Sequence, residues 1–79
     1  MDVPIHAAAA QHHRNIMVEL RQLAEAAGAK RPARLAREIM LLIEGAIAVT
    51  QVNGASVGAA REAARVAQML IDQAIQPDA

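Results

Sequence analysis

Cysteine and aromatic residues are absent from this chain of 79 residues. Without cysteine the chain can form neither a disulfide nor a thiolate metal site, which are two common ways of stabilising a small domain. Without phenylalanine, tyrosine or tryptophan, alanine supplies much of the 54% apolar content, and alanine is the best helix former. A domain this small buries only about 60% of the surface of its unfolded chain. Oligomerisation of close-packed, alanine-rich helices is therefore the natural way to stabilise it.

A charge excess of either sign is also absent, because eight basic residues balance eight acidic ones. A nucleic-acid-binding domain usually carries a basic excess, since contacts to phosphate supply much of its affinity. We therefore expect no direct nucleic-acid binding by this chain.

No apolar stretch is long enough to cross a bilayer. The most apolar run, residues 39–49, is interrupted by Glu44 and Gly45 and falls short of the roughly 20 residues that a membrane span needs. The first four residues lack the basic region that opens a signal peptide. We expect a soluble, cytoplasmic protein that has no membrane partner.

Three helical segments and the lack of an alternating strand pattern predict one all-α domain over residues 1–79, built as a three-helix antiparallel unit. The segments cover about 4–27, 32–52 and 56–75. Gly28 is expected to end the first segment in a left-handed conformation, and Pro32 suits the first turn of the second. Asn53 and Gly54 stop the second segment, and Ser56 is expected to cap the third.

The second segment is apolar around most of its circumference, since only a narrow strip with Arg37, Glu44 and Gln51 is polar. Such a helix is buried on nearly every side, and two short neighbours cannot cover it. A symmetric homodimer that packs the second and third segments as a four-helix bundle would cover the remainder. The predicted interface consists of Leu35, Ile39, Leu42, Ile43, Gly45, Ala46, Ile47, Val49, Ala63, Ala67, Leu70, Ile71 and Ala74.

Gly45 lies in the middle of the second segment, where glycine costs roughly 1 kcal/mol of helix stability relative to alanine. We interpret it as a position at which another helix crosses closely in the dimer interface. A leucine there would then push the helices apart, at a cost of about 1–3 kcal/mol, and would weaken association.

The sequence contains no constellation of catalytic residues, since cysteine is absent and the single serine, Ser56, is explained as a helix cap. We expect no enzymatic activity and no cofactor. The three histidines, His6, His12 and His13, lack the i, i+4 spacing of a helical metal pair. We interpret them as partly exposed side chains near a helix start, the alternative being a ligand-contacting or pH-responsive cluster that includes His12, His13 and Ile16.

Lys30, Arg31, Arg34 and Arg37 form a local basic cluster. The cluster is compatible with a phosphate-binding patch and equally with a solvated link and first helical turn, and no aromatic residue is available to stack a base. Arg34 and Glu38 have the i, i+4 spacing of an ion pair. A solvated surface is the favoured interpretation, and a small dimeric nucleic-acid binder stays as an alternative.

Four short motifs follow one another in an order that has a parallel in a known family. They are Ala27-Gly28-Ala29, Glu44-Gly45-Ala46, Asn53-Gly54 and Ala59-Ala60-Arg61-Glu62-Ala63-Ala64-Arg65. Together with the Leu- and Ala-rich stretch 32–47, they resemble the C-terminal part of TetR-family transcriptional regulators, over nearly the whole chain. In that family the last two helices form the dimer interface as a four-helix bundle, and the helix before them helps to line an effector pocket.

Regulators of this family begin with a helix-turn-helix DNA-binding domain and further pocket helices, which have no counterpart among these 79 residues. The resemblance therefore implies the dimerisation and partial effector-binding domain of a TetR-like regulator, without its DNA-binding part. It further implies a homodimer with a small-molecule effector. A fragment, a truncated gene product and a stand-alone dimerisation module all fit this interpretation. The alternative function is a small helical protein–protein interaction module, such as an adaptor or an antitoxin-like partner.

Overall fold

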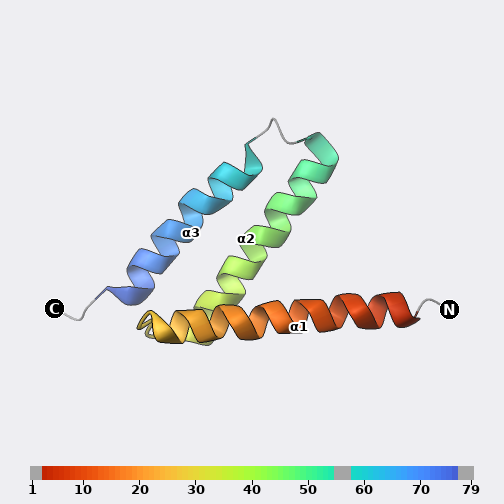
Figure 1. Cartoon of the computed structure of the whole chain (residues 1–79). Helices are drawn as coiled ribbons and strands as arrows, with labels where there is room; N and C mark the ends of the chain where they lie inside the picture. Colours follow the sequence, from red (N-terminus) through yellow and green to blue (C-terminus); the bar gives the residue numbers. More distant parts are fainter. Residues whose placement is uncertain (1–2, 55–57, 77–79) are drawn as a thin grey trace.

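The computed structural model describes the backbone of residues 3–54 and 58–76, and the side chains within these ranges from residue 7 onward. Its helices are α1 (Val3–Ala26), α2 (Pro32–Asn53) and α3 (Ala59–Ile75) (Figure 1). The all-α fold class and the three-helix organisation expected from the sequence are confirmed for this part of the chain. The ends of α1 and α2 lie within one residue of the expected positions.

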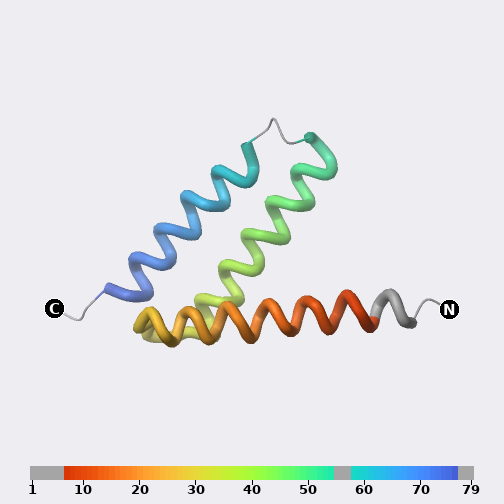
Figure 2. The backbone as a smooth tube through the Cα atoms, viewed as in Figure 1, coloured from red at the N-terminus to blue at the C-terminus, as the bar shows by residue number. Residues whose placement is uncertain are grey.

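The helices are arranged as a hairpin with a crossing helix. α2 and α3 lie side by side and antiparallel, and α2 also packs against α1 (Figure 1). α1 runs across the end of the hairpin at which α2 begins and α3 ends, and its N-terminal half extends beyond the hairpin (Figure 2). α2 is therefore the central helix.

The molecule is a single layer of helices. Its extents are 53 × 31 × 13 Å, and α1 and α3 both pack against α2 but hardly against each other. Most domains pack two or three layers around a core. Among the described residues, the core is limited to Ala24, Leu35, Ala36 and Met40, so both broad faces of the layer remain open to solvent.

The turn between α1 and α2 follows directly from the sequence. Gly28 has a φ of +87° and donates its N–H to the Glu25 carbonyl, while Ala29 donates to the Ala24 carbonyl at 2.9 Å. These two bonds form the Schellman motif that satisfies the last carbonyls of a helix. The Lys30 N–H then donates to the Ala74 carbonyl at 3.0 Å, which ties the link to the end of α3.

The turn between α2 and α3 differs from the expectation at the point where α3 begins. α2 stops as expected at Gly54, whose φ is +88° and whose N–H donates to the Thr50 carbonyl. α3 begins at Ala59 rather than at residue 56, and its N-cap is Gly58, with a φ of +75° and no capping side chain. The expected cap, Ser56, lies outside the described residues. A left-handed glycine occupies the N-cap position and aims the chain into α3.

Large apolar side chains remain exposed over the described part of the layer: Val18, Leu23, Leu41, Ile43, Ile47, Val49, Val52 and Met69. Several belong to α2, the helix whose apolar circumference the sequence showed to be the widest. Within the described residues, no helix combines the length and the hydropathy needed to cross a membrane.

We predict opposite effects of alanine at two glycines. Gly28→Ala forces a Cβ into the left-handed region and should lower the free energy of unfolding by about 1–2 kcal/mol. Gly45→Ala is the matched control, because Gly45 is helical and an added Cβ meets no atom of the described chain within 4 Å. It should raise that free energy by about 1 kcal/mol through helix propensity. Urea unfolding at one protein concentration, followed by circular dichroism, measures both, and effects of the same sign would contradict the assignment.

Candidate functional site

An apolar groove runs between α2 and α3 on one face of the layer. Its volume is about 330 Å³, and its lining contains no charged side chain. The lining consists of Ile39, Leu42, Ile43, Ala46 and Ile47 from α2, and Ala60, Ala63, Ala64 and Ala67 from α3. Ile43 is 40% exposed and Ile47 is 53% exposed, so the groove is open to a partner.

The two walls of the groove differ in shape. The α2 wall presents branched side chains, with a single alanine among them, while every residue on the α3 wall is an alanine. The face is therefore a ridge beside a shallow trough. Such a pairing of ridge and trough is the usual basis of close helix packing.

Gly45 lies on the other side of α2. Ile43 and Ile47, two residues before and after it, are each about 160° away around the helix at 100° per residue. An added Cβ at Gly45 would meet no atom of the described chain within 4 Å, so no helix of the same chain crosses there. A dimer built on the groove leaves Gly45 outside the interface, and the expected effect of Gly45→Leu on association does not apply to such a dimer.

The other predicted interface residues do not form one surface. The structure brings together Ile39, Leu42, Ile43, Ala46, Ile47, Ala63 and Ala67 along the groove. Leu35, Leu70 and Ala74 line a different cavity at the end of the hairpin next to α1, and Leu35 is already buried. Ile71 lines a shallow depression with the last residues of α3, and Val49 is exposed beyond the groove.

The candidate ligand-contacting residues of α1 lie apart from the groove and from the cavity at the end of the hairpin. His12 and His13 are exposed and Ile16 is half-buried. The His13 Nε2 atom lies 3.3 Å from the Glu44 Oε2 atom, a contact between α1 and α2 that attracts as an ion pair when the imidazole is protonated. Both side chains are about half exposed, so water weakens the interaction. Within the described ranges, no three metal-ligating side chains lie close enough together to hold an ion.

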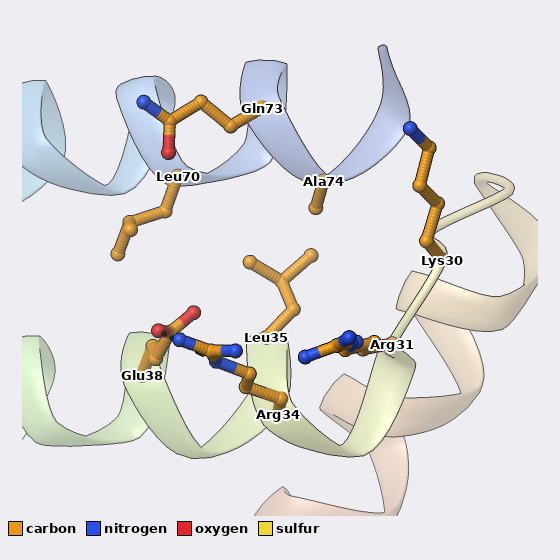
Figure 3. Close-up of a pocket in the computed structure, with 8 residues that line it drawn as sticks. All are labelled: Lys30, Arg31, Arg34, Leu35, Glu38, Leu70, Gln73 and Ala74. Atoms are coloured by element: carbon orange, nitrogen blue, oxygen red, sulfur yellow. Dashed lines mark ion pairs between the residues drawn. The ribbon is translucent and has the colours of Figure 1, made fainter. Parts of the chain in front are cut away.

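The cavity that Leu35, Leu70 and Ala74 line has a volume of about 360 Å³ and lies between the start of α2 and the end of α3 (Figure 3). We call it the basic pocket. It is lined by Lys30, Arg31, Arg34, Leu35, Glu38, Leu70, Gln73 and Ala74. The Arg34 Nε atom lies 3.4 Å from the Glu38 Oε2 atom, so the i, i+4 ion pair expected from the sequence is confirmed.

The basic cluster is therefore divided by the fold. Lys30, Arg31 and Arg34 line the basic pocket, whereas Arg37 lies in a separate depression with Met17, Val18, Arg21 and Ala33 between α1 and α2. Gln73 also lines the basic pocket, although no sequence pattern indicated it. Its position depends on the hydrogen bond between the Lys30 N–H and the Ala74 carbonyl, which joins residues far apart in the sequence and has no local sequence signal.

Comparisons with known proteins add no identity. No protein-family model, no curated protein and no solved structure matches the chain. The geometry thus establishes a small three-helix all-α domain, and the TetR resemblance is carried by the sequence motifs alone.

We predict that the chain forms no specific complex with DNA. A duplex binder needs several cations in register with the phosphates, and Arg37 is separated from the other three cations. A mobility-shift titration at moderate salt should show no discrete complex. A discrete complex that disappears when Arg34 and Arg37 are changed to alanine would contradict the prediction.

Proposed function

We propose that this chain is a homodimerisation module, and more specifically the dimerisation and partial effector-binding part of a TetR-like transcriptional regulator. The single-layer architecture carries the proposal. A layer whose smallest extent is 13 Å, with four buried side chains among the described residues, buries too little apolar surface to be stable alone, because small domains are marginal even with a complete core. A second layer supplies the missing burial.

A second copy of the chain is the partner that the groove fits best. In a two-fold symmetric dimer each surface meets itself in the opposite direction. The branched ridge of α2 in one copy then packs into the alanine trough of α3 in the other, and the reverse contact forms at the same time. Since the groove lining carries no charge, no unpaired charge is buried when the two copies meet.

The size of the face is consistent with a stable dimer. α2 and α3 are 22 and 17 residues long, which corresponds to about 33 and 25 Å at 1.5 Å per residue. Two adjacent helices about 10 Å wide present on the order of 500–600 Å² per copy. Over the full length of both helices the total is about 1,000–1,200 Å², which reaches the roughly 1,000 Å² expected of a biological interface and stays at or below the roughly 1,200 Å² at which standard-sized interfaces begin.

The arrangement supports the finer proposal in two ways. The hairpin of α2 and α3 is the unit that pairs with its copy as a four-helix bundle in TetR-like regulators. α1, the helix before the hairpin, projects past it and carries His12, His13 and Ile16, where the preceding helix of such regulators helps to line the effector pocket. Cytoplasmic location and transcription regulation follow from this proposal.

A charge placed in the groove tests the dimer. Ile43→Glu puts a carboxylate into the interface of both copies at once, because the dimer is symmetric. We expect association to weaken at least about 100-fold, since burying an unpaired charge costs several kcal/mol. Sedimentation equilibrium at micromolar concentration measures the dissociation constant, and the unchanged chain should sediment at twice the mass of one chain.

Leu41→Glu is the matched control, two residues away on the same helix. Leu41 is 68% exposed and lies about 160° around α2 from Ile43. Leu41→Glu should leave the dissociation constant within about threefold of the value for the unchanged chain, because a surface charge outside the interface contributes little to association. If Leu41→Glu dissociates the dimer and Ile43→Glu does not, the opposite face is the interface. A folded monomer of the unchanged chain would favour the alternative, a module whose groove receives a helix of a different protein.

A further inference from the structure

The basic pocket is assembled from three separate segments of the chain. The link supplies Lys30 and Arg31, the first turns of α2 supply Arg34, Leu35 and Glu38, and the end of α3 supplies Leu70, Gln73 and Ala74. Figure 3 shows these side chains around the space between α2 and α3, with Leu35 and Leu70 pointing into it from opposite sides. All of these lining residues belong to one chain.

Arg31 and Arg34 line the pocket together with the carboxylate of Glu38. The Arg34 Nε atom lies 3.4 Å from the Glu38 Oε2 atom, and no hydrogen bond or ion pair to a described residue holds the Arg31 side chain. Arg31 is exposed and the Arg34 side chain is 59% exposed, so both guanidinium groups are accessible. An anion between them would gain charge-assisted hydrogen bonds that the described residues do not supply to Arg31.

Helix stability does not account for these cations. Positive charge near a helix N-terminus is mildly unfavourable, yet α2 has arginine at its N-cap and in its first turn, and no acidic residue there. The pocket also has an apolar floor beside the cations, formed by the half-buried side chains of Leu70 and Ala74 above the buried Leu35. An inorganic ion would contact the cations and leave this floor exposed to water.

We propose that the basic pocket binds a small amphipathic anion, with an oxyanion head group at Arg31 and Arg34 and a short apolar tail on Leu70 and Ala74. Guanidinium groups match the planar geometry of a carboxylate. The volume of about 360 Å³ is at the small end of the range for ligand sites, which fits a ligand with a tail of a few carbons.

Hexanoate is the probe. Acetate has its carboxylate without the long apolar tail, and 1-hexanol has the tail without a carboxylate. In a titration of the ¹⁵N-labelled full chain followed by NMR, hexanoate should give saturable shifts of the amides of Lys30, Leu35, Leu70 and Ala74. Acetate and 1-hexanol should each bind at least about tenfold more weakly, because each lacks one of the two contacts. Equal affinity for hexanoate and 1-hexanol, or shifts that map to the apolar groove, would overturn the proposal.

Two variants separate the pocket from general attraction between charges. Arg31→Gln combined with Arg34→Gln should weaken hexanoate binding at least about fivefold, with the helical circular dichroism unchanged because both side chains are exposed. Arg37→Gln removes a cation of the same sequence cluster from outside the pocket and should leave the affinity within about twofold. Equal losses in both proteins would show that net charge alone attracts the anion, and would overturn the proposal.

Discussion

The proposed dependence of this fold on a second layer begins with α2. Its apolar side chains face nearly every direction, but in a single layer only its two flanks are covered, one by α1 and the other by α3. The buried side chains of α2 are confined to its first three turns, at Leu35, Ala36 and Met40. Beyond them the helix continues toward Asn53 with α3 beside it, and α1 contacts this part through His13, whose Nε2 atom lies 3.3 Å from the Glu44 Oε2 atom. The free energy that a core would supply is therefore missing over more than half of the central helix.

The two faces of the layer are chemically different. The groove face has an uncharged ridge and trough, which suits a copy of the same surface. On the other side of α2, Leu41 and Val52 are exposed near Gly45, without an enclosed cavity among those described. In the proposed dimer the groove provides the association. The end of the hairpin next to α1 stays open, so the basic pocket and the histidines of α1 remain accessible to ligands.

Local signals in the sequence predicted the helices well, and long-range geometry limited the rest. Gly28 and Pro32 mark their turn because their preferences depend on the backbone alone, and Gly54 does the same at the end of α2. The start of α3 at Ala59, three residues later than expected, has no such signal in the pattern, because Gly58 provides the left-handed conformation at the N-cap. The periodicity predicted the apolar stripe of α2. It did not predict which part of that stripe α3 would cover, so Leu35, Leu70 and Ala74 were expected on the same surface as Ile43. The basic pocket depends on packing between the two ends of the chain, which no local pattern encodes.

Concentration-dependent unfolding tests the need for a second layer most directly. If dimerisation stabilises the fold, the thermal midpoint must rise with protein concentration, because dilution favours the dissociated state. For two chains of 79 residues, a 100-fold increase in concentration should raise the midpoint by about 5–10 °C. A midpoint that stays constant over this range, with the unfolding enthalpy of a single 79-residue chain, would contradict it and would mean that the single layer is stable alone.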